Sequence, residues 1–163
     1  MSLTRTHPLW TTTSASLSKV VMATIQVLFL SGRYRMQALV SHWTGGSDEC
    51  QLSPSCNTRE DIVHILQHCS ALNHTRDRLN TFTASYCTSH PMIASIVHRY
   101  CNLRCRLFVQ FLLDCSVIPE VVRAVQTHGQ QILIDLFNIT RMWVYALHRD
   151  RLKILGRWRN FTK

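Results

Sequence analysis

The sequence predicts a mainly α-helical protein, an irregular helical domain with one small loop-helix unit embedded in it. Apolar residues recur at three- and four-residue spacing along most of the chain, which is the period of an amphipathic helix. No stretch of useful length alternates apolar and polar residues as a half-buried strand does. Five glycines and four prolines among 163 residues are too few for a turn-rich β protein or a disordered chain. With 46% apolar residues, the chain can bury the core of one ordinary domain.

The pattern divides the chain into four segments. Residues 1–18 are rich in Ser and Thr and show no apolar period, so we expect a flexible leader there. Residues 19–47 are predicted to be helical, and residues 48–72, hereafter the Cys/His unit, concentrate cysteine and histidine. Residues 73–163 are predicted to form a helical region that ends in a basic, aromatic tail.

Two helices are predicted in the second segment, over 19–30 and 33–43. Ser31 and Gly32 interrupt them, and a glycine-containing loop follows over 44–47. The side chains expected on the buried faces are Val21, Ile25, Leu28, Phe29, Met36, Leu39, Val40 and Trp43.

A short helix is predicted inside the Cys/His unit. Thr58 followed by Asp61 resembles a capping box, with Asp in place of the preferred Glu, so we expect the helix over 59–68. Another helix follows from residue 73 to about residue 82. We expect a loop over 86–90, because the residue before Pro91 disfavours helical backbone.

Three further helices are predicted, over 92–114, 119–128 and 130–156. Pro119 and Glu120 both suit the first turn of the middle one. The apolar period of the first of them consists of Ile93, Ile96, Val97, Tyr100, Leu103, Leu107, Phe108, Phe111 and Leu112. The inward residues of the last are Ile132, Leu133, Leu136, Phe137, Thr140, Val144, Leu147, Leu152 and Leu155.

The formal charge of +9 and the pI near 9.7 indicate an anionic partner: nucleic acid, an anionic membrane surface or an acidic protein. No acidic residue precedes Asp48, and between 141 and 163 Asp150 is the one acid. The seven cations of that tail are Arg141, Arg149, Arg151, Lys153, Arg157, Arg159 and Lys163.

Aromatic residues accompany this charge, which favours single-stranded RNA over a duplex, because rings stack on unpaired bases. Trp158 and Phe161 follow Gly156 and are free to stack, whereas Trp143 lies at helical spacing and is expected in the core. The candidate contacts to RNA or single-stranded DNA are Arg33, Arg35, Arg76, Arg78, Arg149, Arg151, Lys153, Arg157, Trp158 and Arg159.

The Cys/His unit carries the most specific motif, C-x5-C-x7-H-x4-C, formed by Cys50, Cys56, His64 and Cys69. Four soft or borderline ligands so close in sequence can close a tetrahedral Zn²⁺ site. His68 shares a helical face with His64 and is an alternative fourth ligand. Cys69 lies about 140° round an ideal helix from His64 and reaches the metal only if the helix ends or unwinds there. We favour Cys69, the softer ligand. The alternative for the whole motif is incidental cysteines and a core histidine.

The remaining cysteines are Cys87, Cys101, Cys105 and Cys115, and the odd total of seven favours a reducing compartment, nuclear or cytoplasmic. Cys101 and Cys105 with His98 offer only three ligands, and their apolar neighbours favour a core role. No activated nucleophile is evident, so we expect no enzymatic activity from this chain in isolation.

Residues 20–30 and three Asn-x-Ser/Thr triplets, at Asn73, Asn138 and Asn160, are features of a secreted protein. The apolar run is too short to span a bilayer as a helix, so we expect no stable membrane insertion. A small secreted or membrane-associated protein remains an alternative.

The flanks of the motif resemble a known family. Residues 28–43, read as LFLSGRYRMQALVSHW, together with the motif and the following Ala71 and Leu72, are similar to the C-terminal region of LINE-type non-LTR retrotransposon polyproteins. There an LLTGRY…HW helix precedes a CCHC zinc knuckle whose last part reads E-x-x-x-H-x-x-x-x-C-P-A-L. The resemblance spans roughly residues 25–160. The positions that match the family's ligands are Cys50, Cys56, His64 and Cys69. His68 matches none, and Ser70 replaces the proline.

The resemblance implies a nucleic-acid-binding fragment in which zinc is structural. The family's reverse transcriptase uses paired aspartates, and this chain has no Asp-Asp pair, so we expect the polymerase part to be absent. That reverse transcriptase is a possible partner. An alternative is an inert remnant or a protein-interaction module that once packed on the polymerase.

Overall fold

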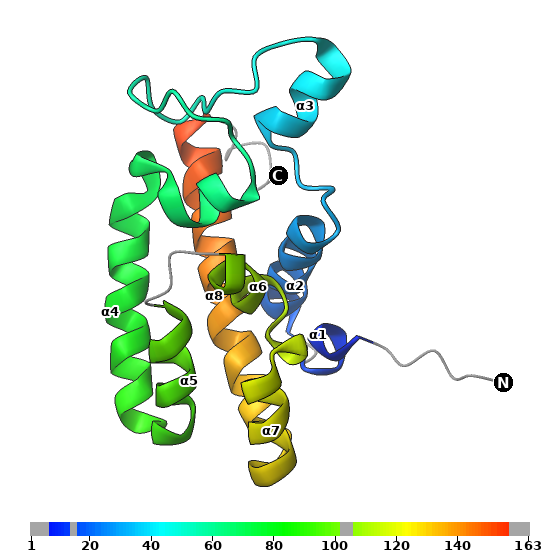
Figure 1. The fold of residues 1–163 in the computed structure, drawn as a ribbon, viewed down its shortest axis with the longest axis vertical. Helices are drawn as coiled ribbons and strands as arrows, with labels where there is room; N and C mark the ends of the chain where they lie inside the picture. Colours follow the sequence, from blue (N-terminus) through cyan, green and yellow to red (C-terminus); the bar gives the residue numbers. More distant parts are fainter. Residues whose placement is uncertain (1–6, 14–15, 102–105, 157–163) are drawn as a thin grey trace, which may run out of the picture.

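The computed structural model describes residues 7–13, 16–101 and 106–156 (Figure 1). These residues form helices and loops, with an isolated antiparallel bridge between Glu49 and Arg59 in place of any strand. The mainly α-helical fold class is therefore confirmed. None of the described helices is long and apolar enough to cross a membrane. The predictions for Leu103, Cys105, Arg157, Trp158 and Arg159 fall outside the described residues.

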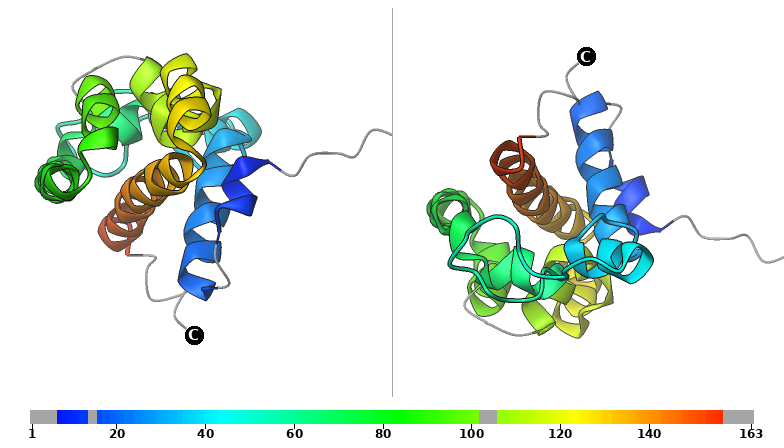
Figure 2. Two further views of the ribbon diagram at one scale, coloured as in Figure 1. Left: turned by 90° about the horizontal axis from the view of Figure 1, so that it is seen from below. Right: turned by 90° about the horizontal axis from the view of Figure 1, so that it is seen from above.

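The longest described helix, α8 (Gln131–Ile154), lies at the centre, and most of the others pack against it. Figure 2 shows α4 and α2 on opposite sides of α8, while α5, α6 and α7 cover a third side. In chain order the helices are α1 (Pro8–Thr11), α2 (Leu17–Leu30), α3 (Gln37–Thr44), α4 (Asn73–Ser89), α5 (Pro91–Cys101), α6 (Arg106–Leu113), α7 (Pro119–His128) and α8.

The core along α8 follows the predicted apolar period. Of its predicted inward residues, only Leu155 is half-buried rather than buried. Trp143 is buried, as predicted, and its Nε1 donates to the Thr83 hydroxyl of α4 at 2.9 Å. The polar end of this large ring is therefore satisfied inside the core.

Helix boundaries differ from prediction, most of all at the end of α4 and the start of α3, and two helices, α5 and α6, stand where one was predicted over 92–114. Residues 86–89 are predicted as a loop but form the last turn of α4. Pro91 is the first residue of α5, so His90 alone separates the two helices. The second difference is that α3 begins at Gln37 rather than at residue 33, since residues 31–36 form the turn that follows α2.

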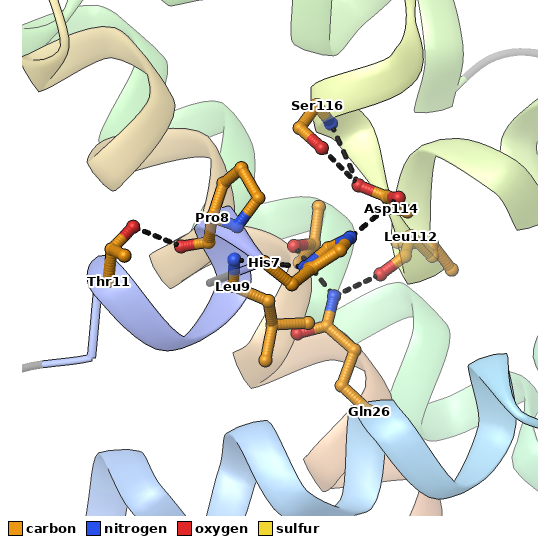
Figure 3. A network of polar contacts seen from close by, with 9 residues as sticks. His7, Pro8, Leu9, Thr11, Gln26, Leu112, Asp114 and Ser116 are labelled. Atoms are coloured by element: carbon orange, nitrogen blue, oxygen red, sulfur yellow. Dashed lines mark hydrogen bonds and ion pairs between the residues drawn. The ribbon is translucent and has the colours of Figure 1, made fainter. Parts of the chain in front are cut away.

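The buried face of α2 is rotated relative to the prediction. Val21 is exposed, and the buried residues are Ala23, Gln26 and Phe29. The Gln26 Nε2 donates to the Leu112 carbonyl at 2.6 Å, and that carbonyl is one of those left unpaired at the end of α6 (Figure 3). The buried side-chain amide of Gln26 is therefore tolerated because it donates to a carbonyl that the end of α6 leaves without a partner. Trp43 and Leu107, also predicted inward, are exposed.

Part of the predicted flexible leader is ordered, which corrects the expectation for residues 7–13. Leu9 is completely buried, and the buried guanidinium of Arg141 donates to its carbonyl and to the carbonyl and hydroxyl of Thr12. Figure 3 shows His7 directed at Asp114, with 3.1 Å between Nε2 and Oδ2. The prediction failed because a four-residue helix has no detectable period and its anchors lie more than a hundred residues away.

We predict that Leu9→Ala destabilises the fold by about 2–5 kcal/mol, because it removes a fully buried side chain. The matched control is Leu17→Ala, since Leu17 is 78% exposed, and its effect should stay within about 0.5 kcal/mol. Urea unfolding followed by circular dichroism gives both values. Equal effects would mean that residues 7–13 do not pack on the domain in solution.

Candidate metal centre

Backbone pairing holds the two N-terminal cysteines of the Cys/His unit. The Cys50 amide donates to the Thr58 carbonyl at 2.9 Å, and the Glu60 amide donates to the Asp48 carbonyl at 2.8 Å. These bonds close residues 50–58 into a loop whose ends lie side by side. Inside it, the Cys56 amide donates to the Ser53 carbonyl at 3.0 Å. Cys50 and Cys56 are thus fixed on one small, closed scaffold.

The helix that follows begins later than predicted, at Ile62. Arg59 and Glu60 pair with residues across the loop, so Asp61 becomes the cap, and its Oδ1 accepts from the His64 amide at 2.8 Å. Capping a helix end in this way satisfies an otherwise unpaired amide. The predicted Thr58 cap is therefore wrong.

A π-helical turn over His64–His68 brings the last two ligands together. The Cys69 amide donates to the His64 carbonyl, five residues back, at 2.7 Å. In an α-helix the two residues would point about 140° apart. The wider turn and the end of the helix at Cys69 remove that separation. The helix thus ends and unwinds at Cys69, which is the condition under which Cys69 was expected to reach the metal.

The four candidate ligand atoms of Cys50, Cys56, His64 and Cys69 all lie within 4.8 Å of one another. The sulfurs of Cys50 and Cys69 are 3.7 Å apart, and the Cys56 sulfur is 3.2 Å from His64 Nε2. Bonds of about 2.3 Å to sulfur and 2.0 Å to nitrogen give tetrahedral edges of roughly 3.5–3.8 Å. The group therefore fits a four-coordinate metal ion with small adjustments, and it is the one such cluster found among the described residues. His68 is exposed and is not part of it.

Burial sets the protonation of this group. Burial, with the neighbouring Cys50 thiol adding to it, raises the pKa of Cys69 to about 12, and burial also raises the pKa of Cys50. Burial lowers the pKa of His64. Without metal, Cys50 and Cys69 are thus thiols and His64 is a neutral imidazole at pH 7, and a bound ion would displace the thiol protons. Cys56 is the half-exposed member, which leaves a route for the ion to enter.

Arg76 of α4 donates hydrogen bonds to the backbone of the π-helical turn and of Cys69. Its Nη1 donates to the Ile65 carbonyl at 3.2 Å, and its Nη2 donates to the Cys69 carbonyl and to Asn73. The side chain is buried by these contacts. The prediction that Arg76 contacts nucleic acid is therefore wrong, because its guanidinium is occupied inside the fold.

Glu60 joins the Cys/His unit to the rest of the domain. Its carboxylate is fully buried and accepts from Arg151 of α8 and, at 3.0 Å, from the Gln37 amide at the start of α3. Arg151 also lies over the Tyr34 ring, with 5.5 Å from its Cζ to the ring centroid. The predicted nucleic-acid contact by Arg151 is therefore also wrong.

The other predicted cations that the structure describes are accessible. Arg33, Arg35 and Arg78 are exposed and form no ion pair with the described residues. Arg149 and Lys153 each lie 3.3 Å from the same oxygen of Asp150 and remain partly exposed. His98 is exposed and Cys101 half-buried, while Cys105 lies outside the described residues.

Sequence reasoning missed the roles of Glu60 and of Arg76. Nothing in a single sequence distinguishes a buried charged residue from an exposed one when each has ordinary neighbours. Glu60 stands four residues before a candidate ligand, and this spacing is the only signal in the chain that pointed to it.

Comparisons with protein-family models, curated proteins and solved structures find no match to this chain.

Breaking the Glu60–Arg151 pair should be costly. We predict that Glu60→Gln and Arg151→Met each lower the free energy of unfolding by about 3–5 kcal/mol, because each leaves one buried charge unpaired. A double variant should cost less than the sum. Arg59→Ala is the control, since its pair with Asp48 is exposed and contributes at most about 1 kcal/mol.

Metal content tests the cluster itself. We predict one divalent ion per purified chain, measured by inductively coupled plasma mass spectrometry, and its loss in Cys56→Ala. Cys87→Ala, which changes a buried cysteine of α4 outside the cluster, should retain the ion. Retention of the metal by Cys56→Ala would exclude the four-ligand arrangement.

Proposed function

We propose that the Cys/His unit holds a structural Zn²⁺ through Cys50, Cys56, His64 and Cys69. The convergence of these four ligand atoms is the observation that carries the proposal. Three sulfurs and an imidazole suit zinc rather than magnesium or calcium, which prefer oxygen. Four protein ligands leave no open position, as in zinc sites that stabilise folds rather than catalyse reactions. The ion would fix the loop over 50–58 to the π-helical turn.

We infer that the domain binds single-stranded nucleic acid, with RNA favoured. The support is a surface formed by α4 and α8 and lined by Arg78, Phe82, Tyr145, Arg149 and Lys153. Four of them line one cleft of about 270 Å³, and Lys153 lies beside it on α8. Phe82 is 46% exposed, so its ring is accessible to a base, and the cations suit the phosphates. We call these five residues the α4–α8 surface.

The α4–α8 surface sharpens the prediction made from the tail. The aromatic residues after Gly156 lie outside the described part of the chain, but Phe82 and Arg78 stand one turn apart on α4. Together with the resemblance to non-LTR retrotransposon proteins, this supports a C-terminal fragment that holds RNA for a polymerase encoded elsewhere in the parent element.

A protein-interaction module is the second candidate. Trp43, at the end of α3, is 79% exposed, and exposed aromatic residues are typical anchors of protein interfaces. Trp43→Ala should then abolish partner binding without affecting RNA binding.

We predict that a labelled single-stranded RNA binds the zinc-loaded chain and that its affinity falls about 10- to 100-fold between 50 and 200 mM salt, as expected for three to five phosphate contacts. Fluorescence anisotropy measures the affinity and its dependence on salt. Arg78→Gln combined with Lys153→Gln should weaken binding and reduce the salt dependence. Arg99→Gln combined with Arg123→Gln, a change of two exposed arginines on α5 and α7, is the charge-matched control. Binding that ignores salt, or that the control weakens equally, would contradict the assignment.

A further inference from the structure

A second cleft lies on another face of α8. It has a volume of about 330 Å³, near the lower end of the range for small-ligand sites, and it opens between α2, the turn over 31–36 and the last part of α8. Ile25, Leu28 and Leu152 give it aliphatic walls. Its polar lining residues are Arg33, Tyr34, Arg35, His148 and Arg151.

The charges around this cleft are not balanced. Arg33 and Arg35 are exposed and form no ion pair or side-chain hydrogen bond with the described residues. Arg151 is compensated by Glu60, yet its Nε is buried without a hydrogen-bond partner among them. Guanidinium groups only donate, and no carboxylate lines the cleft. A ligand that fits must therefore bring acceptor atoms and negative charge.

The remaining polar residues of the cleft add no charge at neutral pH. The Tyr34 hydroxyl and His148 Nδ1 are hydrogen-bonded at 2.8 Å. Burial, and then the charge of Arg151, lower the pKa of His148 to about 4, so its imidazole is neutral. The positive potential comes from the arginines alone.

We propose that this cleft binds a small organic anion, whose phosphate or carboxylate pairs with Arg33 and Arg35 and whose apolar body lies against Ile25, Leu28 and Leu152. Phosphate and carboxylate both match the donor fork of arginine. A nucleoside monophosphate and a medium-chain fatty acid present this chemistry equally. The proposal is independent of RNA binding, because the α4–α8 surface shares no residue with the cleft.

Calorimetric titration of the full zinc-loaded chain tests the proposal with four probes: adenosine monophosphate, octanoate, and their neutral counterparts adenosine and octanol. We expect one or both anions to bind at a single site, and each neutral counterpart to bind at least about tenfold more weakly. Binding of the nucleotide alone would identify a nucleotide site, and binding of octanoate alone would identify an acyl-chain site. Failure of both anions to bind at millimolar concentration would overturn the proposal.

Two double variants test whether the anion binds in this cleft. Arg33→Gln combined with Arg35→Gln should weaken the anion at least about tenfold, and its circular dichroism should be unchanged because both side chains are exposed. Arg99→Gln combined with Arg123→Gln removes two exposed arginines elsewhere and should change nothing. Undiminished affinity in the first variant would refute the site. Inorganic phosphate that binds as tightly as the organic anions would refute the role of the aliphatic walls.

Discussion

The buried ion pair between Glu60 and Arg151 is the contact on which the arrangement of the chain depends. It joins the Cys/His unit to α8, and the same carboxylate oxygen accepts the Gln37 amide at the start of α3. A buried pair gains little over well-packed apolar residues, but an unpaired charge in the interior is very unfavourable. The pair therefore disfavours other compact arrangements, because a packing that separates the unit from α8 while keeping both residues buried leaves each charge unpaired.

The same constraint changes how the positive charge of the chain is interpreted. Arg76, Arg141 and Arg151 are buried and donate to carbonyls, a hydroxyl or a carboxylate of the protein itself. They stabilise the π-helical turn, the N-terminal segment and the Cys/His unit respectively. A net charge counted from the sequence therefore overstates the surface open to an anionic partner. Accessible cations gather at two faces of α8, the α4–α8 surface and the cleft beside Arg33 and Arg35, and others, such as Arg99 and Arg123, are exposed elsewhere.

The sequence predicted best where a signal is periodic or local. The buried face of α8 and the start of α7 at Pro119 follow from apolar spacing and proline placement. The ligand spacing predicted the cluster, yet Cys69 reaches it only through a π-helical turn, which no propensity encodes. The exposure of Trp43 and the anchoring of Leu9 by Arg141 are set by long-range packing. Such contacts cannot be derived from residues near in sequence.

X-ray absorption at the zinc edge of the zinc-loaded chain reads out the ligands of the proposed metal centre. We predict three sulfur neighbours at about 2.3 Å and one nitrogen at about 2.0–2.1 Å. In Cys69→Ala, one sulfur should be lost from that shell. A shell dominated by nitrogen and oxygen, or one that keeps three sulfurs in Cys69→Ala, would contradict the assignment of Cys50, Cys56, His64 and Cys69 as the ligands.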